Sequence, residues 1–489
     1  MTTQAAELHY AVRFAVVCRY LGQLCLAIAF ITLVPLLVAL ASYEPAIALR
    51  YAVVVTVLLA MGLLARRLRP PHQYRVQENE AIVLTALVFL LTPLLMSYPI
   101  MASGLSFIDS LFETVSGITT TGLSTVLLVE EKSRAFLFAR AWQQWAGGLG
   151  IVVLSLAFLP QQAFVAKRLA LAEGYQDDLV GGTKAHARRM VWVYSAITLA
   201  GVGLLMLFGA DLFDAVLYSL ASVSTGGFAP HNQSLAGLGG WPLQAAVTLL
   251  CFSCAISLPL YHQSLHKGWR ILPADLQVRA LLLVATMLTL FLALTMHRIS
   301  GLPWPQVLRH APLLAFSAQT TTGFATLDLA ALDGGSKLLV ILAMAVGGGI
   351  GSTAGGFKIM RLLILLRLLY GAVVRAGLPR HAVYHLRLEE SRLEEPEIRN
   401  ALLIILLYVM VIILSWLVFV LHGYDPLNAL FEVVSAVGTV GLSVGVTSSE
   451  LPALLKGVLC LDMLMGRLEI FCWLIVFYPK TWIGKRVEV

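Results

Sequence analysis

The chain has 489 residues, of which 59% are hydrophobic and only 12% are charged, and its formal net charge is +7. The charged fraction is about half that of a typical soluble domain, and apolar runs long enough to cross a bilayer recur along the whole length. These properties exclude an ordinary soluble protein and predict an all-α, polytopic membrane protein. The positive charge requires no nucleic-acid partner, because membrane topology accounts for it.

The apolar segments form one pair at the N-terminus and then four similar units. The first two predicted spans cover roughly 12–42 and 47–65; no small-residue cleavage site follows the first, which favours a true span over a signal peptide. Each later unit contains a long span, a short apolar segment, a Thr/Gly tract and a second long span. We predict these spans and short segments at 78–100, 108–118 and 133–160; 187–210, 212–223 and 241–265; 275–298, 305–317 and 336–370; and 398–422, 426–436 and 452–479. The predicted domains are therefore an N-terminal hairpin (1–70) and four pore repeats (71–165, 166–270, 271–385 and 386–489).

The short segments have about 11 residues each and would reach only about half-way across a bilayer core as helices. We interpret them as re-entrant half-helices, because irregular backbone at that depth is tolerated where it lines a water-filled cavity. The predicted fold is two N-terminal transmembrane helices followed by four pseudo-fourfold helix–pore loop–helix repeats around a central ion pore.

The four Thr/Gly tracts, aligned on their last glycine, are separated by 105, 96 and 118 residues. Glycine permits positive φ, so successive carbonyls can turn the same way, and threonine adds a hydroxyl without charge. Four such tracts around one axis could replace the hydration shell of a monovalent cation with carbonyl oxygens. The alternative is that the small residues only permit close helix packing. The predicted K+ filter residues are Thr120, Thr121, Gly122, Thr225, Gly226, Gly227, Thr321, Thr322, Gly323, Thr439, Val440 and Gly441.

The basic residues predict the orientation of the chain in the membrane. Five segments, 66–75, 167–189, 267–279, 358–399 and 480–486, hold 23 of the 34 lysines and arginines. Basic loops stay in the cytoplasm, so we expect both termini there and the four tracts opening on the outer side.

Glu113 and Glu432 stand at equivalent offsets before the first and fourth tracts, in segments that share Phe, Glu, Val and Ser. We interpret both glutamates as hydrogen-bond acceptors that support the filter. Asp109, Asp214 and Asn428 stand 13 residues before the key glycines and suit helix N-caps.

A glycine-rich stretch lies within the second span of the third repeat, where glycine costs roughly 1 kcal/mol per residue in a helix. We predict an unwound segment under the filter that acts as a gate, the alternative being a small-residue packing face. Arg467 lies in the middle of the last span and must face protein or water. It is either part of a structural ion pair with Glu469, Glu432 or Glu113, or a positive barrier below the filter. The predicted gate residues are Gly347, Gly348, Gly349, Gly351, Ser352, Thr353, Gly355, Gly356 and Arg467.

Four span–pore loop–span units on one chain resemble the Trk/Ktr/HKT superfamily of potassium and sodium transporters, and the N-terminal pair and the length resemble its TrkH branch. The supporting motifs are Gln144-Trp145-Ala146-Gly147-Gly148-Leu149-Gly150, Gly351-Ser352-Thr353-Ala354-Gly355-Gly356-Phe357-Lys358 and Met465-Gly466-Arg467-Leu468-Glu469. In that family glycine at each loop is associated with potassium permeation, and serine in the first loop with sodium preference. The resemblance implies K+ as the transported ion, with Na+ and Rb+ as further candidates. It also implies that the glycine-rich segment acts as a gate and that Arg467 acts as a positive barrier.

The resemblance also implies a homodimer in the lipid bilayer of the bacterial cytoplasmic (inner) membrane, and a cytoplasmic nucleotide-binding subunit of the TrkA type. The mixed basic and acidic segment 358–399 is the candidate docking surface for that subunit.

Two other classes compete with a potassium uptake pore. One is an alternating-access cation symporter coupled to Na+ or H+, although that class usually has two repeats rather than four equivalent loops. The other is a membrane-embedded enzyme, which would need His, Asp, Glu or Cys clustered at depth. The eleven histidines are scattered, so we expect no enzyme and assign no catalytic residues.

Overall fold

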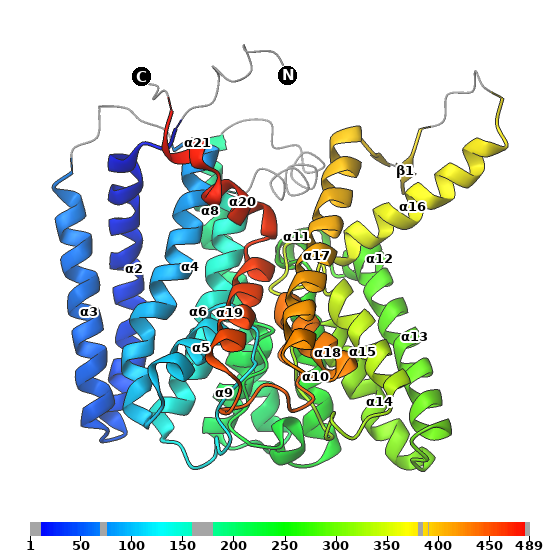
Figure 1. Cartoon of the computed structure of the whole chain (residues 1–489), viewed down its shortest axis with the longest axis horizontal. Helices are drawn as coiled ribbons and strands as arrows, with labels where there is room; N and C mark the ends of the chain where they lie inside the picture. Colours follow the sequence, from blue (N-terminus) through cyan, green and yellow to red (C-terminus); the bar gives the residue numbers. More distant parts are fainter. Residues whose placement is uncertain (1–10, 69–75, 159–178, 380–384, 390, 485–489) are drawn as a thin grey trace.

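The computed structural model describes residues 11–68, 76–158, 179–379, 385–389 and 391–484. Helices account for almost all of the regular structure (Figure 1). The one strand pairing within these residues joins two-residue strands, β1 (Arg387–Leu388) and β2 (Ser391–Arg392), in antiparallel register. The predicted all-α fold is therefore confirmed.

The N-terminal hairpin consists of α2 (Phe14–Ala41) and α3 (Pro45–Arg66), which pack along each other and against α4 (Figure 1). Proline has no backbone N–H, so Pro35 inside α2 leaves the carbonyl of Ile31 without its usual helical donor. The indole N–H of Trp142 on α6 donates to that carbonyl at 3.1 Å. This hydrogen bond ties the hairpin to the first repeat.

Four repeats follow the hairpin, each with a first helix, a half-helix and a second helix, as predicted. The half-helices are amphipathic and deeply buried, and they begin and end within about two residues of the predicted bounds. In chain order the elements of the repeats are α4 (Glu78–Ile100), η1 (Met101–Ser103), α5 (Phe107–Ile118) and α6 (Arg134–Phe158); α8 (Leu179–Leu207), α9 (Leu212–Val223), η2 (Ser234–Leu238), α10 (Trp241–Ala255), α11 (Leu258–Lys267) and α12 (Ile271–Ala274); α13 (Leu276–Arg298), α14 (Trp304–Gln319), α15 (Gly334–Val346) and α16 (Ile359–Ala376); and α17 (Glu395–Leu421), α18 (Pro426–Val437), α19 (Ala453–Arg467), α20 (Ile470–Phe477) and α21 (Pro479–Trp482).

Three of the second spans are broken, which corrects the prediction of continuous helices in repeats two and four. α10 and α11 meet at a bend of 88°, where Pro259 occupies the first turn of α11 and favours a helix start. α19 and α20 are separated at Leu468–Glu469, where Glu469 has φ of 57°. In repeat three the helix stops at Val346 and resumes at Ile359, so the predicted interruption is present.

Six described helices are long and apolar enough to cross a membrane, or seven if the bent α10–α11 pair forms one span. Their large apolar side chains are widely exposed, for example Leu283 at 60% and Leu406 at 64%, as expected for a surface facing lipid tails. The chain is therefore a multi-pass membrane protein.

The two ends of the helical bundle carry different elements. α16, β1 and α21 lie near one end, and α9 and α14 lie near the other (Figure 1). The first group comes from two of the predicted basic segments, whereas the half-helices lie between such segments in the sequence. Parts of the basic segments, namely 69–75, 167–178, 380–384 and 485–486, lie outside the described residues.

Candidate functional site

The four Thr/Gly tracts close into one ring. A Cβ atom added to the last glycine of each tract would overlap the carbonyl oxygen of the preceding position in the next tract. Gly122 faces the carbonyl of Gly226, Gly227 that of Thr322, Gly323 that of Val440, and Gly441 that of Thr121. The order is thus first to second, second to third, third to fourth and fourth back to first. The tracts, 105, 96 and 118 residues apart in sequence, converge on one axis.

The backbone repeats almost identically in the four tracts. The threonine two residues before each glycine has φ between 49° and 55°, and the glycines have φ between 76° and 91°. Positive φ is rare for β-branched residues and costs of order 1–3 kcal/mol at each position. In two tracts a serine six residues before the glycine accepts its N–H, Ser116 from Gly122 at 3.0 Å and Ser435 from Gly441 at 3.1 Å. Strain repeated four times and locally stabilised is typical of a functional site.

The four positive-φ threonines are almost fully buried, and we call the side of the ring on which they lie its inner end. The hydroxyls of Thr120 and Thr439 have no hydrogen-bond partner among the described residues. The hydroxyl of Thr225 donates to the Ser224 carbonyl at 2.7 Å, and that of Thr321 accepts the N–H of Gly355 at 2.6 Å. Buried hydroxyl oxygens without partners, beside carbonyls and without carboxylates, suit a weakly hydrated monovalent cation as the transported species.

The second tract has glycine where the others have Thr or Val, and Gln144 of α6 fills the space. A Cβ added to Gly226 would overlap the Gln144 amide. That amide donates to the Gly226 carbonyl and accepts the N–H of Phe228 at 3.1 Å. The irregular third position of the tracts is thus compensated by a side chain from a neighbouring helix.

Glu113 and Glu432 each hold the chain that follows their own tract. Glu113 accepts the Ser124 hydroxyl at 2.6 Å and the Thr125 N–H at 2.8 Å. Glu432 accepts the Ser443 hydroxyl at 2.6 Å and the Val444 N–H at 2.9 Å. Both side chains are buried, and each accepts hydrogen bonds from the chain that follows its own tract.

The two glutamates differ in one respect. Arg140 of α6, itself buried, forms an ion pair with Glu113 at 3.0 Å and lies over the ring of Phe228 in the second tract, 3.8 Å from its centroid. Among the described residues Glu432 forms no ion pair; its second oxygen accepts the Thr447 hydroxyl at 2.7 Å. The first and fourth repeats therefore share the same fold but differ in the charge that lies beside their glutamates.

This inequality predicts different costs for the same substitution. Glu113→Gln leaves the Arg140 charge buried without its counter-ion, so we expect a loss of about 3–5 kcal/mol. Glu432→Gln keeps a carbonyl acceptor for the same backbone donors, so we expect about 1 kcal/mol or less. Thermal unfolding of the detergent-solubilised protein measures both. Adding Arg140→Met to Glu113→Gln should restore most of the loss; equal destabilisation by the two single changes would contradict the inequality.

The glycine-rich segment between α15 and α16 lies against the inner end of the ring. The Gly356 N–H donates to the Gly438 carbonyl at 3.1 Å, and the Thr353 hydroxyl donates to the Val223 carbonyl at 3.0 Å. With the contact between Gly355 and Thr321, the segment touches the second, third and fourth tracts or their half-helices. Gly347 also accepts the Gln319 amide at 2.7 Å.

The other side of the same segment is fixed to the bend between α10 and α11. The Gly349 N–H donates to the Ala255 carbonyl at 2.9 Å, and the Leu258 N–H donates to the Gly351 carbonyl at 3.0 Å. Gln277 of α13 accepts the Ile350 N–H at 2.9 Å. Ser352 closes a local turn by donating to the Gly349 carbonyl at 2.6 Å.

Arg467 donates to the Thr353 carbonyl in this segment at 2.7 Å. Its other two guanidinium nitrogens are buried without a hydrogen-bond partner in the described chain. Two of the candidate ion-pair partners are paired elsewhere, Glu469 with Arg361 at 2.6 Å and Glu113 with Arg140. Arg467 thus places its charge at the glycine-rich segment, where it lines a cavity of about 30 Å³ together with Lys358 and Glu469.

The polar residues 13 positions before the key glycines are not N-caps, which corrects that interpretation. The caps are three residues earlier: Ser106 accepts the Asp109 N–H, and Asp425 accepts the Asn428 N–H. Asp109 contacts Lys456 of the fourth repeat at 2.6 Å, and Asn428 contacts Lys337 of the third repeat at 3.0 Å. These contacts link the repeats at the ends of the half-helices.

Sequence reasoning missed Arg140 and Asp462. Both lie in predicted spans, so the rule applied to Arg467, that a charge at membrane depth needs a partner, would have indicated them. Asp462 is buried and accepts the Ser415 hydroxyl at 2.6 Å, and its other oxygen has no partner in the described part of the chain. The role of Gln144 depends on a contact between repeats and has no local signal.

The fold and this site define a multi-pass membrane protein in which four loops on one chain, each after a half-helix, close into a single ring. The chain belongs to the TrkH family of cation transport proteins, whose model matches residues 51–483. It is thus a transport protein and not an enzyme, as predicted.

Individual relatives match over nearly the whole chain. The Trk system potassium uptake protein TrkI of Halomonas elongata is 30% identical over 482 residues, which cover 96% of this chain and 97% of the relative. The Trk system potassium uptake protein TrkG of Escherichia coli is 28% identical over 419 residues, covering 83% and 86%. The crystal structure of the potassium transporter TrkH from Vibrio parahaemolyticus superposes with a TM-score of 0.87 at 26% identity and covers 96% of this chain and all of that one.

Proposed function

We propose that this protein carries K+ across the membrane through the ring of the four Thr/Gly tracts, with backbone carbonyls and threonine hydroxyls as ligands. The observation that supports this most strongly is the closed ring of glycine–carbonyl contacts between the tracts. The C-termini of four half-helices meet the ring and add negative partial charge there. The names of the relatives indicate potassium as the ion.

Ion flux into liposomes tests this proposal and separates K+ from Na+. Purified protein should admit K+ and Rb+ down a gradient, driven by potential at about 2.3 kcal/mol per charge per 100 mV. Gly122→Ser adds a side chain that overlaps the Gly226 carbonyl, so we expect the preference for K+ over Na+ to fall about tenfold or more. Absence of any cation flux from wild-type protein would reject the proposal. Flux that strictly requires a Na+ or H+ gradient would favour the symporter alternative.

The segment 347–356, with Arg467, is the proposed gate. It touches the inner end of the ring on one side and the α10–α11 bend on the other, which supports the proposal that it closes the path inward from the tracts. Its backbone is held mainly by single hydrogen bonds to other elements, each of which contributes only about 0.5–1.5 kcal/mol. Such a segment can be displaced without unfolding the surrounding helices.

Deleting Gly348 to Gly351 should raise basal K+ flux about tenfold or more, because it removes the bonds to Ala255, Gln277 and Leu258. Gln277→Leu keeps the chain length and removes one of these bonds, so we expect a several-fold rise, whereas Gln277→Glu retains the acceptor. Flux from proteoliposomes is the measurement, with thermal unfolding as the control for folding. Wild-type flux and regulation in both loosened variants would exclude the gate.

We also propose a cytoplasmic nucleotide-binding regulator of the TrkA type, docked on α16 and the β1–β2 turn. These elements lie at the end of the bundle that carries the basic segments (Figure 1). Exposed charges are available there, for example the Arg279–Glu389 pair. Charge reversal at both residues should leave basal flux unchanged and weaken co-purification of the regulator.

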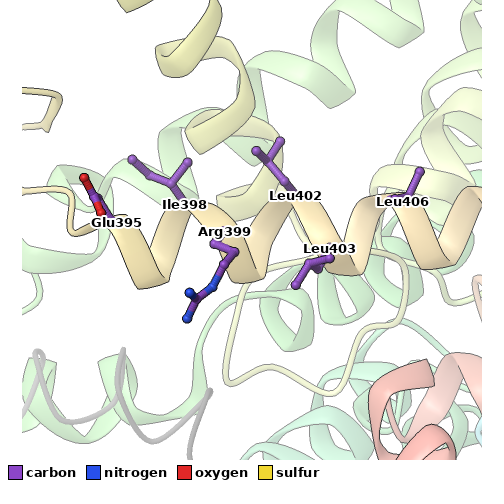
Figure 2. Close-up of a pocket in the computed structure, with 6 residues that line it drawn as sticks. All are labelled: Glu395, Ile398, Arg399, Leu402, Leu403 and Leu406. Carbon is purple, nitrogen blue, oxygen red and sulfur yellow. The ribbon is translucent and has the colours of Figure 1, made fainter. Parts of the chain in front are cut away.

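A homodimer in the inner membrane, with both termini in the cytoplasm, completes the proposal. The candidate contact is the groove along α17, where Leu402, Leu403 and Leu406 are exposed beside Arg399 (Figure 2). Native mass spectrometry of the wild type and of a Leu402→Trp, Leu406→Trp double variant tests it. Accessibility of tagged termini tests the orientation.

A further inference from the structure

A cavity of about 250 Å³ lies between the N-terminal hairpin and the first repeat. Its walls come from α2, α3, α4 and α6 and from Ile118, the last residue of the half-helix α5. The volume is close to the lower end of the range of about 300–1,000 Å³ for small-molecule pockets. Among the described residues that line it, none is acidic, basic or a histidine.

Three polar side chains on this wall are buried and incompletely hydrogen-bonded. The Tyr51 hydroxyl, the Thr92 hydroxyl and both ends of the Gln143 amide make no hydrogen bond of good geometry with the described residues, although the Tyr51 hydroxyl lies close to the Gln143 amide. Their residues are only 1%, 8% and 5% exposed. Buried polar groups in proteins are almost always hydrogen-bonded. The contact between Tyr51 and Gln143 accounts for at most two of the four atoms, so the other two indicate a missing partner at this cavity.

The remaining polar groups on the wall are already paired. The Thr32 hydroxyl donates to the Ile28 carbonyl at 2.7 Å, and the Trp142 indole donates to that of Ile31. The rest of the wall is apolar, including Phe89, Met96 and Val153. The cavity thus has one uncharged polar corner, with donors and acceptors, in an otherwise apolar surface.

We propose that this cavity binds an uncharged amphiphile, a molecule with an apolar body and one hydroxyl, carbonyl or amide group. The polar group bonds to Tyr51, Thr92 and Gln143, and the apolar body fills the remainder. A charged head group is disfavoured because nothing on the wall neutralises it. Water alone would satisfy the polar corner but would leave the apolar volume without favourable contacts.

The ligand enters from the lipid. Ala27 on α2 is exposed and Gly150 on α6 is half-buried, and both line the cavity, so its edge reaches the lipid-facing surface between these helices. A Cβ added to Gly150 would meet no atom within 4 Å. This position is open, and a larger side chain there would extend into the cavity.

The site adjoins the end of the first half-helix, where the first tract begins. A Cβ on Gly117 of the first half-helix would stand 2.8 Å from the Gln143 amide oxygen, and the next residue, Gln144, holds the second tract. A ligand in the cavity would therefore contact the turn of α6 that carries Gln143 and Gln144 and that touches the first and second tracts. An effect on ion flux would rest on the proposed function, so the test reads binding itself.

Photolabelling of the full chain in lipid nanodiscs tests the proposal, with a diazirine analogue of 1-octanol as the probe and mass spectrometry to locate the label. We expect labelling of the cavity wall in the wild type, with competition by 1-octanol and much weaker competition by n-octane at the same membrane concentration. Gly150→Leu should reduce wall labelling at least tenfold, and Gln143→Leu should reduce it several-fold.

Gly203→Leu is the matched control. It is also a helical glycine whose added Cβ meets nothing within 4 Å, but it lies on α8 away from the cavity, so labelling should stay at the wild-type level. Label spread evenly over lipid-facing helices, or undiminished in Gly150→Leu, would overturn the proposal and leave the cavity to water. Neither result depends on K+ flux, so failure here is distinguishable from failure of the proposed function.

Discussion

Gly441→Ala should lower K+ flux by about 100-fold or more, equivalent to about 2.7 kcal/mol. The added methyl group is unfavourable for two reasons, backbone strain and steric overlap. The backbone has φ of 89°, which an L-residue adopts at a cost of about 1–3 kcal/mol. The added Cβ would also overlap the Thr121 carbonyl oxygen of the first tract, so the ring must open where the fourth tract meets the first. Rubidium uptake by proteoliposomes is the measurement.

Gly445→Ala separates the two costs. Gly445 lies four residues further along the same loop and also has φ of 89°, but a Cβ there would meet no atom within 4 Å. It carries the conformational strain without the overlap, so we expect slightly reduced stability and near-normal flux. Equal loss of flux in both variants would mean that backbone strain alone matters and that the ring contact carries no function.

The pattern of the fold was predictable because it depends on local signals. Half-helix lengths follow from apolar runs too short to span a bilayer, and the α15–α16 interruption follows from glycines that destabilise a helix. The α10–α11 bend also had a local signal, since Pro259 favours a helix start, but it was not used. The Leu468–Glu469 break had none: Glu469 keeps a positive φ while paired with Arg361 of another repeat.

The sequence predicted which residues belong to the candidate site, but it did not predict which of them contact one another. Repetition alone located the key glycines, because four copies at similar spacing are improbable as packing devices. The cyclic order of the tracts, the insertion of Gln144 and the pairing of Arg140 with Glu113 all join different repeats. Contacts of that kind depend on how helices pack, which the hydrophobic pattern of a single segment does not encode.

The contacts of the glycine-rich segment indicate that the proposed gate and the proposed filter use some of the same groups. Gly355 donates to the hydroxyl of Thr321, which is itself one of the four inner threonines, and Gly356 donates to the carbonyl that precedes Thr439. In the proposed gate, movement of the segment would therefore free the Thr321 hydroxyl and the Gly438 carbonyl. A gate of this kind would change the innermost ion ligands as it opens, in addition to clearing the path.

Arg467→Gln should raise K+ flux about tenfold. A positive charge near the ion path opposes a cation by up to about 4 kcal/mol at 4 Å in a medium of effective dielectric about 20, and relief of about 1.4 kcal/mol gives a tenfold increase. Glutamine retains an N–H donor for the Thr353 carbonyl, whereas Arg467→Lys retains the charge. If the charge is the barrier, the glutamine variant conducts fast and the lysine variant slowly.

Flux of K+ into proteoliposomes measures both variants, and thermal unfolding reports whether they are folded. The ion-pair alternative predicts a different result, because removing one member of a buried pair costs about 3–5 kcal/mol of stability. The contact of Arg467 with a carbonyl rather than with Glu469 or Glu113 argues for the smaller stability change. A folded Arg467→Gln protein that conducts at the wild-type rate would exclude the charge as a barrier and leave Arg467 as a hydrogen-bond donor to the glycine-rich segment.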